Sequence, residues 1–278
     1  MKSQKEMILD EKLVVKVKEI VQANCPEDDL PVRIMEELIS NPEVKAIQDY
    51  SNNVSINRLG FNDHGPVHMR IVCQNALRII GILKVGGIGT SLQNEGAGTF
   101  ADSLSAVIIA AMMHDAGMTI GRKDHELYSG IITCGLITGI LEKLLPGEEN
   151  VIRRTVIRSV ALEGIIGHMG TRSIHSLEAG IILVSDGCDM TKGRARIPLE
   201  HISKASEGDI HKYSAGAIEA VRLRPGEEKP LRIIVEMKES VGFFQIEEVL
   251  IPKIKASSLY PHIELYAGVI GEDTKRYL

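Results

Sequence analysis

The sequence predicts a mainly α-helical protein: a helical bundle followed by a small C-terminal α+β unit with the element order ββαβ. Over most of the chain, apolar side chains recur every three to four positions, as they do on the buried face of a helix. Beyond Ala205, two short apolar runs flank a turn that contains proline and glycine, which is the pattern of a hairpin. With 278 residues, of which 44% are apolar, the chain can bury a full core.

Three helices are expected before the central part of the chain. In residues 10–23, apolar side chains follow the helical period and stop at Asn24-Cys25-Pro26. Residues 31–39 and 42–50 each begin with proline, which is favoured in the first turn of a helix. Residues 1–55 contain no motif that suggests chemistry, so we expect their helices to pack on the bundle.

The bundle is expected over residues 56–204. A helix from Gly65-Pro66 to about Leu83 leads into a glycine-rich stretch, residues 86–98. Because this stretch follows a helix and not a strand, it is interpreted as a surface loop and not as a phosphate-binding loop. Further helices are expected to end at His114-Asp115 and to cover residues 125–145, 148–167 and 173–191.

The C-terminal unit is expected over residues 205–278. Strands are predicted at residues 217–223 and 231–237, a helix at residues 243–257 and a third strand at residues 263–270. This unit could close the active site, bind an effector or pair subunits through an exposed strand edge, which would make a homo-oligomer. A purely structural appendage is the remaining alternative.

Composition narrows the class of protein. The net charge is −5 and no long basic block is present, which argues against nucleic acid as the main partner and leaves a small anionic substrate compatible. No apolar run approaches a membrane span and the N-terminus lacks a signal-peptide core, so we expect a cytoplasmic protein with no membrane partner. The four cysteines form no CxxC pair and are interpreted as small buried hydrophobic residues.

His114-Asp115 is the most informative feature for function. The dipeptide ends the apolar run of residues 106–113, where a histidine and a carboxylate are costly to bury unless something binds them. Other residues at suggestive positions could bind the same group. Together they form a candidate metal centre, whose further members are His68, His125, His168 and Asp186.

Helix geometry sorts the neighbouring polar residues. His64 and His68 are four apart and share a helix face if the helix begins just before the first of them, which suits one metal ligand and one proton donor. Asp186 and Asp189 are expected to share a face of one helix, where Asp189 would hydrogen-bond a ligand histidine or a metal-bound water. His175 precedes Asp186 by about 16 Å of helix axis and is therefore not expected to bind the same metal.

These residues resemble the HD-domain metal-dependent phosphohydrolases, and the resemblance covers residues 62–196. The segment Gly167-His168-Met169-Gly170 is similar to the branch with two metals and a His-His-Asp-His-His-Asp ligand set, which includes diadenosine polyphosphate hydrolases. The other matching elements are His68 with Val72 and Ala76, His114-Asp115-Ala116-Gly117, His125-Glu126, and the apolar run that closes at Asp186.

The resemblance implies an HD-type helical bundle and a specific set of site residues. The implied metal ligands are His68, His114, Asp115, His125, His168 and Asp186. The pair His64 and His68 also resembles the HNxxH element of cyclic-nucleotide phosphodiesterases, with Gly65 in place of the asparagine. By that resemblance His64 is expected to be the proton donor, beside Asp115 as the second catalytic residue.

The donor types indicate the metals and the reaction. Imidazoles with carboxylates favour Mn, Fe, Co, Ni or Zn over calcium, with Mg as a further option at a weaker site. If Asp115 bridges two metals about 3.5–4 Å apart, a metal-activated water would attack phosphorus. The cations expected to bind the substrate phosphate are Arg122, Lys123, Lys192 and Arg194.

The expected activity is therefore metal-dependent hydrolysis of a phosphate ester or anhydride in a nucleotide-like substrate. A phosphomonoesterase, a phosphodiesterase and a pyrophosphohydrolase all remain open. The alternative is a sensor module that binds a nucleotide or metal without turnover. An intact ligand set favours catalysis, because a binding module need not keep every ligand.

Overall fold

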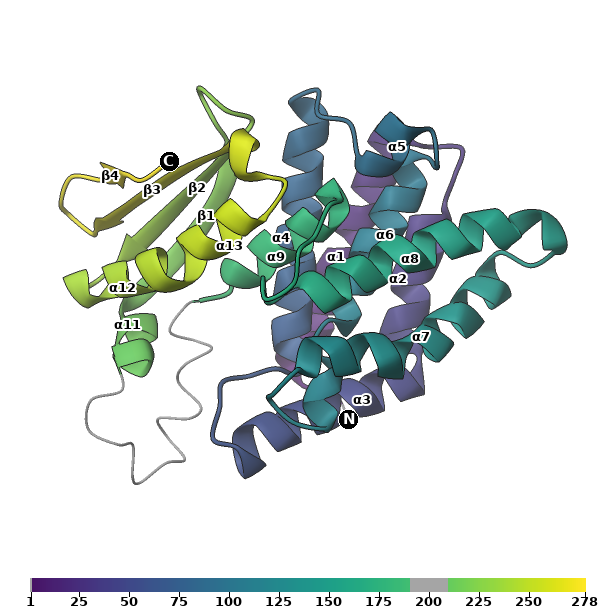
Figure 1. The fold of residues 1–278 in the computed structure, drawn as a ribbon, viewed down its shortest axis with the longest axis horizontal. Coiled ribbons are helices and arrows are strands. Elements are labelled where there is room, and N and C mark those ends of the chain that lie inside the picture. Colours follow the sequence, from purple (N-terminus) through teal and green to yellow (C-terminus); the bar gives the residue numbers. More distant parts are fainter. Residues whose placement is uncertain (1, 191–209) are drawn as a thin grey trace.

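The computed structural model describes residues 2–190 and 210–278, and it contains a helical bundle with a small α+β unit beside it (Figure 1). The sheet lies at one side of the bundle, and helix α9 of the bundle runs next to α13 of the C-terminal unit. The predicted fold class, a mainly helical protein with a small C-terminal α+β unit, is confirmed.

The N-terminal part forms α1 (Gln4–Asn24), α2 (Leu30–Ser40) and α3 (Pro42–Asn53). Helix α1 begins earlier than its apolar period indicates because Ser3 and Glu6 form a capping box, in which each side chain accepts from the other residue's backbone N–H. Proline stands in the first turn of α2 and of α3, as expected.

The bundle is built around a fully buried helix. It comprises α4 (Pro66–Val85), α5 (Ser91–Glu95), α6 (Phe100–Met113), α7 (His125–Leu144), α8 (Val151–Gly167) and α9 (Leu177–Gly187). Every residue of α6 is buried, and this helix contacts α2, α4, α8 and α9. A helix that is apolar on all faces needs such surroundings on every side.

The glycine-rich stretch is anchored at the end of α9 that lies away from Asp186. Within it, Ser91 and Leu92 donate their backbone N–H groups to the buried carboxylate of Glu178, in the first turn of α9. The anchored segment forms the short helix α5.

Helix α9 is shorter than predicted. Its expected start at residue 173 is wrong because the Ser176 side chain accepts from the N–H of Ala179 and caps the helix there. The helix also ends at Gly187, so Asp189 lies beyond it and the predicted shared helix face with Asp186 is wrong.

The C-terminal unit begins with α11 (Ile210–Ala217) and carries a four-stranded mixed sheet in the order β1-β2-β3-β4. Strands β1 (Ile218–Pro225) and β2 (Leu231–Met237) are antiparallel, whereas β2 and β3 (Ile263–Val269) are parallel and need a crossover. The crossover is a helical segment: α12 (Phe243–Gln245), a π-helical turn (Ile246–Leu250) and α13 (Ile251–Ala256). The two-residue strand β4 (Lys275–Arg276) was not predicted.

Two glycines allow α9 and the C-terminal unit to approach closely. A Cβ atom on Gly180 would stand 2.6 Å from the Ser258 hydroxyl, and a Cβ atom on Gly187 would stand 3.1 Å from Cδ of Lys253. One buried apolar cluster runs from Leu13 in α1 through the bundle to Ala267 in β3. The division into residues 1–55, 56–204 and 205–278 stays a prediction.

Helix α7 is a 20-residue helix with a largely apolar composition. Among the described residues, it is the one helix long and apolar enough to cross a membrane by those two criteria, so the expectation that no apolar run approaches a span is wrong for this helix. Core helices of soluble proteins, which are mostly buried, meet the same criteria; α7 packs against α8, and 33% of its apolar window is buried. The structure is consistent with a soluble protein, and a cytoplasmic location stays a prediction.

Candidate metal centre

The structure brings together six polar side chains from five helices or helix ends. His114 follows the last residue of α6, His168 follows the last residue of α8, and both therefore stand at the negative ends of helix dipoles, which favour cations. The loop after α6 turns sharply at Gly117, where a Cβ atom would lie 2.0 Å from the carbonyl oxygen of His125. All six side chains are buried: His68, His114, Asp115, His125, His168 and Asp186.

Backbone carbonyls fix the hydrogen position on three of the four histidines. A carbonyl oxygen only accepts hydrogen bonds, so the imidazole that faces it carries its hydrogen on Nδ1 and leaves Nε2 with a lone pair. Each carbonyl belongs to the residue three positions earlier: Ala111 at 2.9 Å from His114, Arg122 at 2.9 Å from His125, and Ile165 at 2.7 Å from His168.

A carboxylate does the same for the fourth histidine. His68 Nδ1 lies 2.6 Å from Oδ2 of Asp189, which also only accepts when it is ionised. His68 Nε2 is therefore the nitrogen that faces the centre. The structure thus places Asp189 where the sequence analysis expected it to act, although it reaches this position from beyond the end of α9.

Removing Asp189 is expected to weaken metal binding about 10- to 100-fold, because outer partners of ligand histidines have effects of that size. The variant Asp189→Ala leaves His68 free to change tautomer and ring orientation. The measurement is a competition titration of Mn²⁺ or Zn²⁺ against a chelator, with the exposed Asp273→Ala as the control. Equal affinities in the two variants would contradict this role.

The Nε2 atoms of the four histidines form two pairs, and each pair lies close to a different oxygen of the Asp115 carboxylate. Nε2 of His68 and Nε2 of His114 are 3.1 Å apart and lie 3.2 and 3.4 Å from Oδ2 of Asp115. Nε2 of His125 and Nε2 of His168 are also 3.1 Å apart and lie 3.2 and 3.4 Å from Oδ1. Oδ1 of Asp186 joins the first pair, 3.2 Å from His68 Nε2.

In each pair the two Nε2 lone pairs point toward each other and toward an Asp115 oxygen, an arrangement that suits a bound cation. Oδ1 of Asp115 is buried and makes no hydrogen bond within the described part of the chain, despite the two nearby imidazoles. Two Nε2 atoms that both lack a hydrogen repel each other and the carboxylate unless a positive ion stands among them. His/Asp groups within metal-binding distance of one another therefore form a cluster that could hold metal and fits an HD-type site.

Protonation states agree with a site built for a cation. Burial alone would raise the pKa of Asp115, but its interactions with the surrounding histidines, His64 foremost, outweigh burial and hold that pKa well below its usual range. Burial lowers the pKa of His168 to about 4. At neutral pH the carboxylate is ionised and this imidazole is neutral, which are the forms that bind metal.

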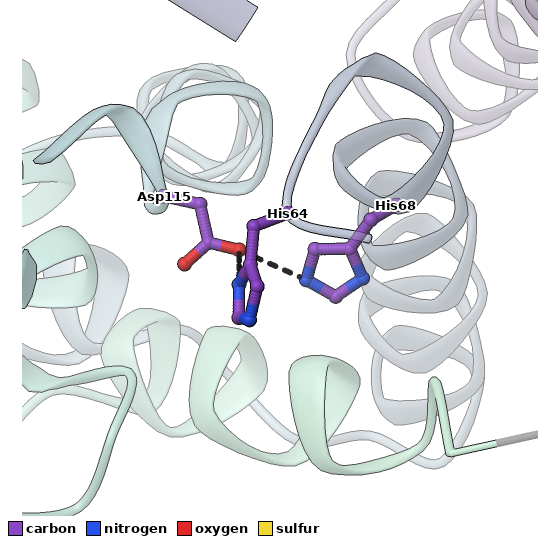
Figure 2. Close-up of side chains that lie close together, drawn as sticks. All are labelled: His64, His68 and Asp115. Atoms are coloured by element: carbon purple, nitrogen blue, oxygen red, sulfur yellow. Dashed lines mark hydrogen bonds and ion pairs between the residues drawn. The ribbon is translucent and has the colours of Figure 1, made fainter. Parts of the chain in front are cut away.

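His64 reaches the centre by a different route from the one predicted. Helix α4 begins at Pro66, so His64 precedes the helix and the expected shared face with His68 is wrong. The loop nevertheless directs its ring at Asp115, with Nδ1 at 2.6 Å from Oδ2 (Figure 2). Figure 2 also shows His68 approaching the same carboxylate oxygen from α4.

Of the four cations predicted to bind the substrate phosphate, the structure describes Arg122 and Lys123, and only Arg122 lines the cavity in front of the centre. The guanidinium of Arg122 lies 3.4 Å from Nε2 of His125. Lys123 is exposed and lies outside the lining of that cavity. Lys192 and Arg194 lie outside the described residues.

The cavity has a volume of about 610 Å³ and lies between the bundle and the C-terminal unit. Its walls include Asp115, Asp186 and His64 on one side and α12–α13 on the other. Lys253 of α13 donates to the carboxylate of Asp186, a contact that the sequence analysis missed. One lysine in an amphipathic helix carries no motif that could have identified it.

Comparison with known proteins gives one informative match. The chain is 39% identical over 243 residues to the "Uncharacterized protein MJ1020" of Methanocaldococcus jannaschii, an alignment that covers 87% of this chain and 91% of that protein. No protein-family model matches the sequence. No solved structure gives a significant match.

Proposed function

The chain belongs to the family of MJ1020, and because that name states no activity, we propose its function from the chemistry of the centre. We propose that it is an HD-type phosphohydrolase that depends on two divalent metal ions. Its substrate in this proposal is a nucleotide-like phosphate ester or anhydride.

The proposal rests on one observation: the two carboxylate oxygens of Asp115 face two different histidine pairs. Oδ2 faces the pair of His68 and His114, and Oδ1 faces the pair of His125 and His168. A carboxylate placed in this way suits a bridge between two ions. Asp186 adds a second carboxylate on the His68 side. Imidazole and carboxylate donors favour Mn, Fe, Co, Ni or Zn, with Mg as a further option.

Two bound divalent ions would supply an activated water and neutralise phosphate oxygens. The chain's own residues would orient the substrate and move protons. Asp115 fixes His64 through the 2.6 Å contact at Nδ1, so Nε2 of His64 is the nitrogen that would pass a proton to the leaving oxygen. Arg122 lines the same cavity and would hold a phosphate oxygen.

The direct test is purified protein loaded with Mn²⁺ or Co²⁺ and assayed on nucleotides, cyclic dinucleotides and a chromogenic phosphodiester. We expect turnover of at least one of these substrates and about two bound ions per chain by elemental analysis. Chelation should remove both properties. Stability should fall with the metal, by about 4 kcal/mol if the free ion had stood 1,000-fold above its Kd.

Two results would contradict the proposal. Absence of turnover on every substrate, combined with less than one ion per chain, would exclude a dinuclear hydrolase. Tight nucleotide binding without any product would instead favour the sensor alternative.

A further inference from the structure

Lys253 joins the C-terminal unit to the metal centre. It extends from α13, donates to Oδ2 of Asp186, and also donates to the backbone carbonyl of His168 at 3.0 Å. Its side chain is only 11% exposed. A buried ammonium is costly unless charged or polar partners surround it, so this placement is specific.

The lysine reaches this position because α9 has no side chain in its path. Gly187 follows Asp186 directly, and a Cβ atom there would lie 3.1 Å from Cδ of Lys253. The aliphatic stem therefore lies against the backbone of α9 while the ammonium reaches the carboxylate.

The ammonium and a metal ion can use Asp186 at the same time. Oδ1 of Asp186 faces the histidines, 3.2 Å from Nε2 of His68, whereas Oδ2 faces Lys253. Lys253 therefore need not be displaced when a metal binds. An ammonium has three N–H donors, and the two contacts above use two of them.

Neither contact uses the third N–H donor of Lys253, and the residue also lines the cavity. Lys253 and Arg122 both line the cavity of about 610 Å³, and they come from the C-terminal unit and the bundle respectively. A volume of this size is typical of small-molecule sites, which span roughly 300–1,000 Å³. Apolar side chains line part of the remaining wall, among them Met169, Val249 and Pro252, and the polar residues Gln245 and Glu248 line it beside them.

We propose that Lys253 binds the substrate phosphate from the side opposite Arg122, so that the C-terminal unit forms half of the substrate site. This proposal rests on the proposed function. It assigns the substrate to small phosphorylated molecules whose remaining part fits against the mixed wall of α12–α13, where Val249 and Pro252 offer apolar contacts and Gln245 and Glu248 offer polar ones. It also gives the C-terminal unit a direct role in binding substrate.

The test measures binding of inorganic phosphate by calorimetry to protein loaded with Co²⁺ and freed of unbound ion. Lys253→Met keeps the length of the stem and removes the charge, and Lys255→Met, an exposed lysine on the same helix, is the matched control. We expect Lys253→Met to weaken phosphate binding about 10- to 100-fold, the range for a lost charged hydrogen bond. Lys253→Arg should recover part of the loss, and Lys255→Met should bind like the wild type.

Metal content is measured on every variant by elemental analysis. Unchanged phosphate affinity in Lys253→Met, with unchanged metal content, would overturn the proposal and leave the hydrolase function standing. Loss of metal from both Lys253 variants would also overturn it, by showing that the lysine only positions Asp186. If phosphate binding depends on Lys253 but no ester is hydrolysed, the proposed function fails and the anion site remains. Wild-type protein that binds no phosphate would refute the anion site.

Discussion

Replacing Asp115 with alanine is expected to lower turnover by about 1,000-fold or more and to release bound metal. The reason is geometric, because both oxygens of this one carboxylate face histidine pairs and the same carboxylate holds His64. Within residues 2–190 and 210–278, no second carboxylate faces both histidine pairs in this way, so none could take over this role. The measurements are ion content by elemental analysis and initial rates on the best substrate.

Two further variants separate loss of the Asp115 charge from a general effect of substitution near the centre. Asp115→Asn keeps the shape of the side chain but has a single acceptor oxygen, so we expect it to retain at most one ion per chain. Asp124→Asn is the control, since Asp124 is exposed and has a positive φ of 55°, which asparagine tolerates. Metal content and rate that survive in Asp115→Ala would exclude the bridging role.

Replacing Arg70 with alanine is expected to lower the free energy of unfolding by about 1.5–3 kcal/mol, the range for lost hydrogen bonds to a charged group. Arg70 is 2% exposed, and its guanidinium donates to Asp10 at 2.6 Å and to Gln48 at 2.9 Å. Gln48 in turn donates to the carbonyl of Met112, two residues before His114. Removing the arginine leaves the buried carboxylate of Asp10 with Lys2, at 2.6 Å, as its remaining cation, and it leaves the side-chain oxygen of Gln48 without this donor.

Urea denaturation of metal-free protein measures this effect without the contribution of the ion. Arg78→Ala is the matched control, because Arg78 is exposed on the same helix and should change stability by less than about 0.5 kcal/mol. The double variant Arg70→Ala/Asp10→Asn should recover part of the loss, since it also removes the charge of the carboxylate that has lost its arginine. A loss in Arg70→Ala that equals the loss in Arg78→Ala would contradict the prediction.

The sequence predicted the fold class well because periodicity is strong in this chain. Strand β2 has its predicted bounds, and α7 and α8 each lie within a few residues of theirs. The errors fall where a single cap decides the boundary. Ser3 extends α1 and Ser176 delays α9, and neither effect is visible in the apolar pattern.

The candidate ligands could be located because each stands next to an apolar helix. His114 follows the fully buried helix α6, His168 follows helix α8, and Asp186 is the penultimate residue of the buried helix α9. Lys253 could not be located in this way, because it lies 67 residues from Asp186 and meets it only through the packing of α13 on α9. Contacts between separate units depend on tertiary packing, which a local pattern does not encode.

Because the six clustered side chains come from different helix ends, a metal bound to them would affect local unfolding of the bundle. They come from the ends of α4, α6, α7, α8 and α9, which are separate in sequence and otherwise could fray independently. In the proposed centre, where Asp115 faces both histidine pairs, the ions would have to be released before any one of these ends could detach. Amide hydrogens in the five helix ends would then exchange with solvent in a single concerted event, so the centre would set the size of the cooperative unit in this half of the molecule.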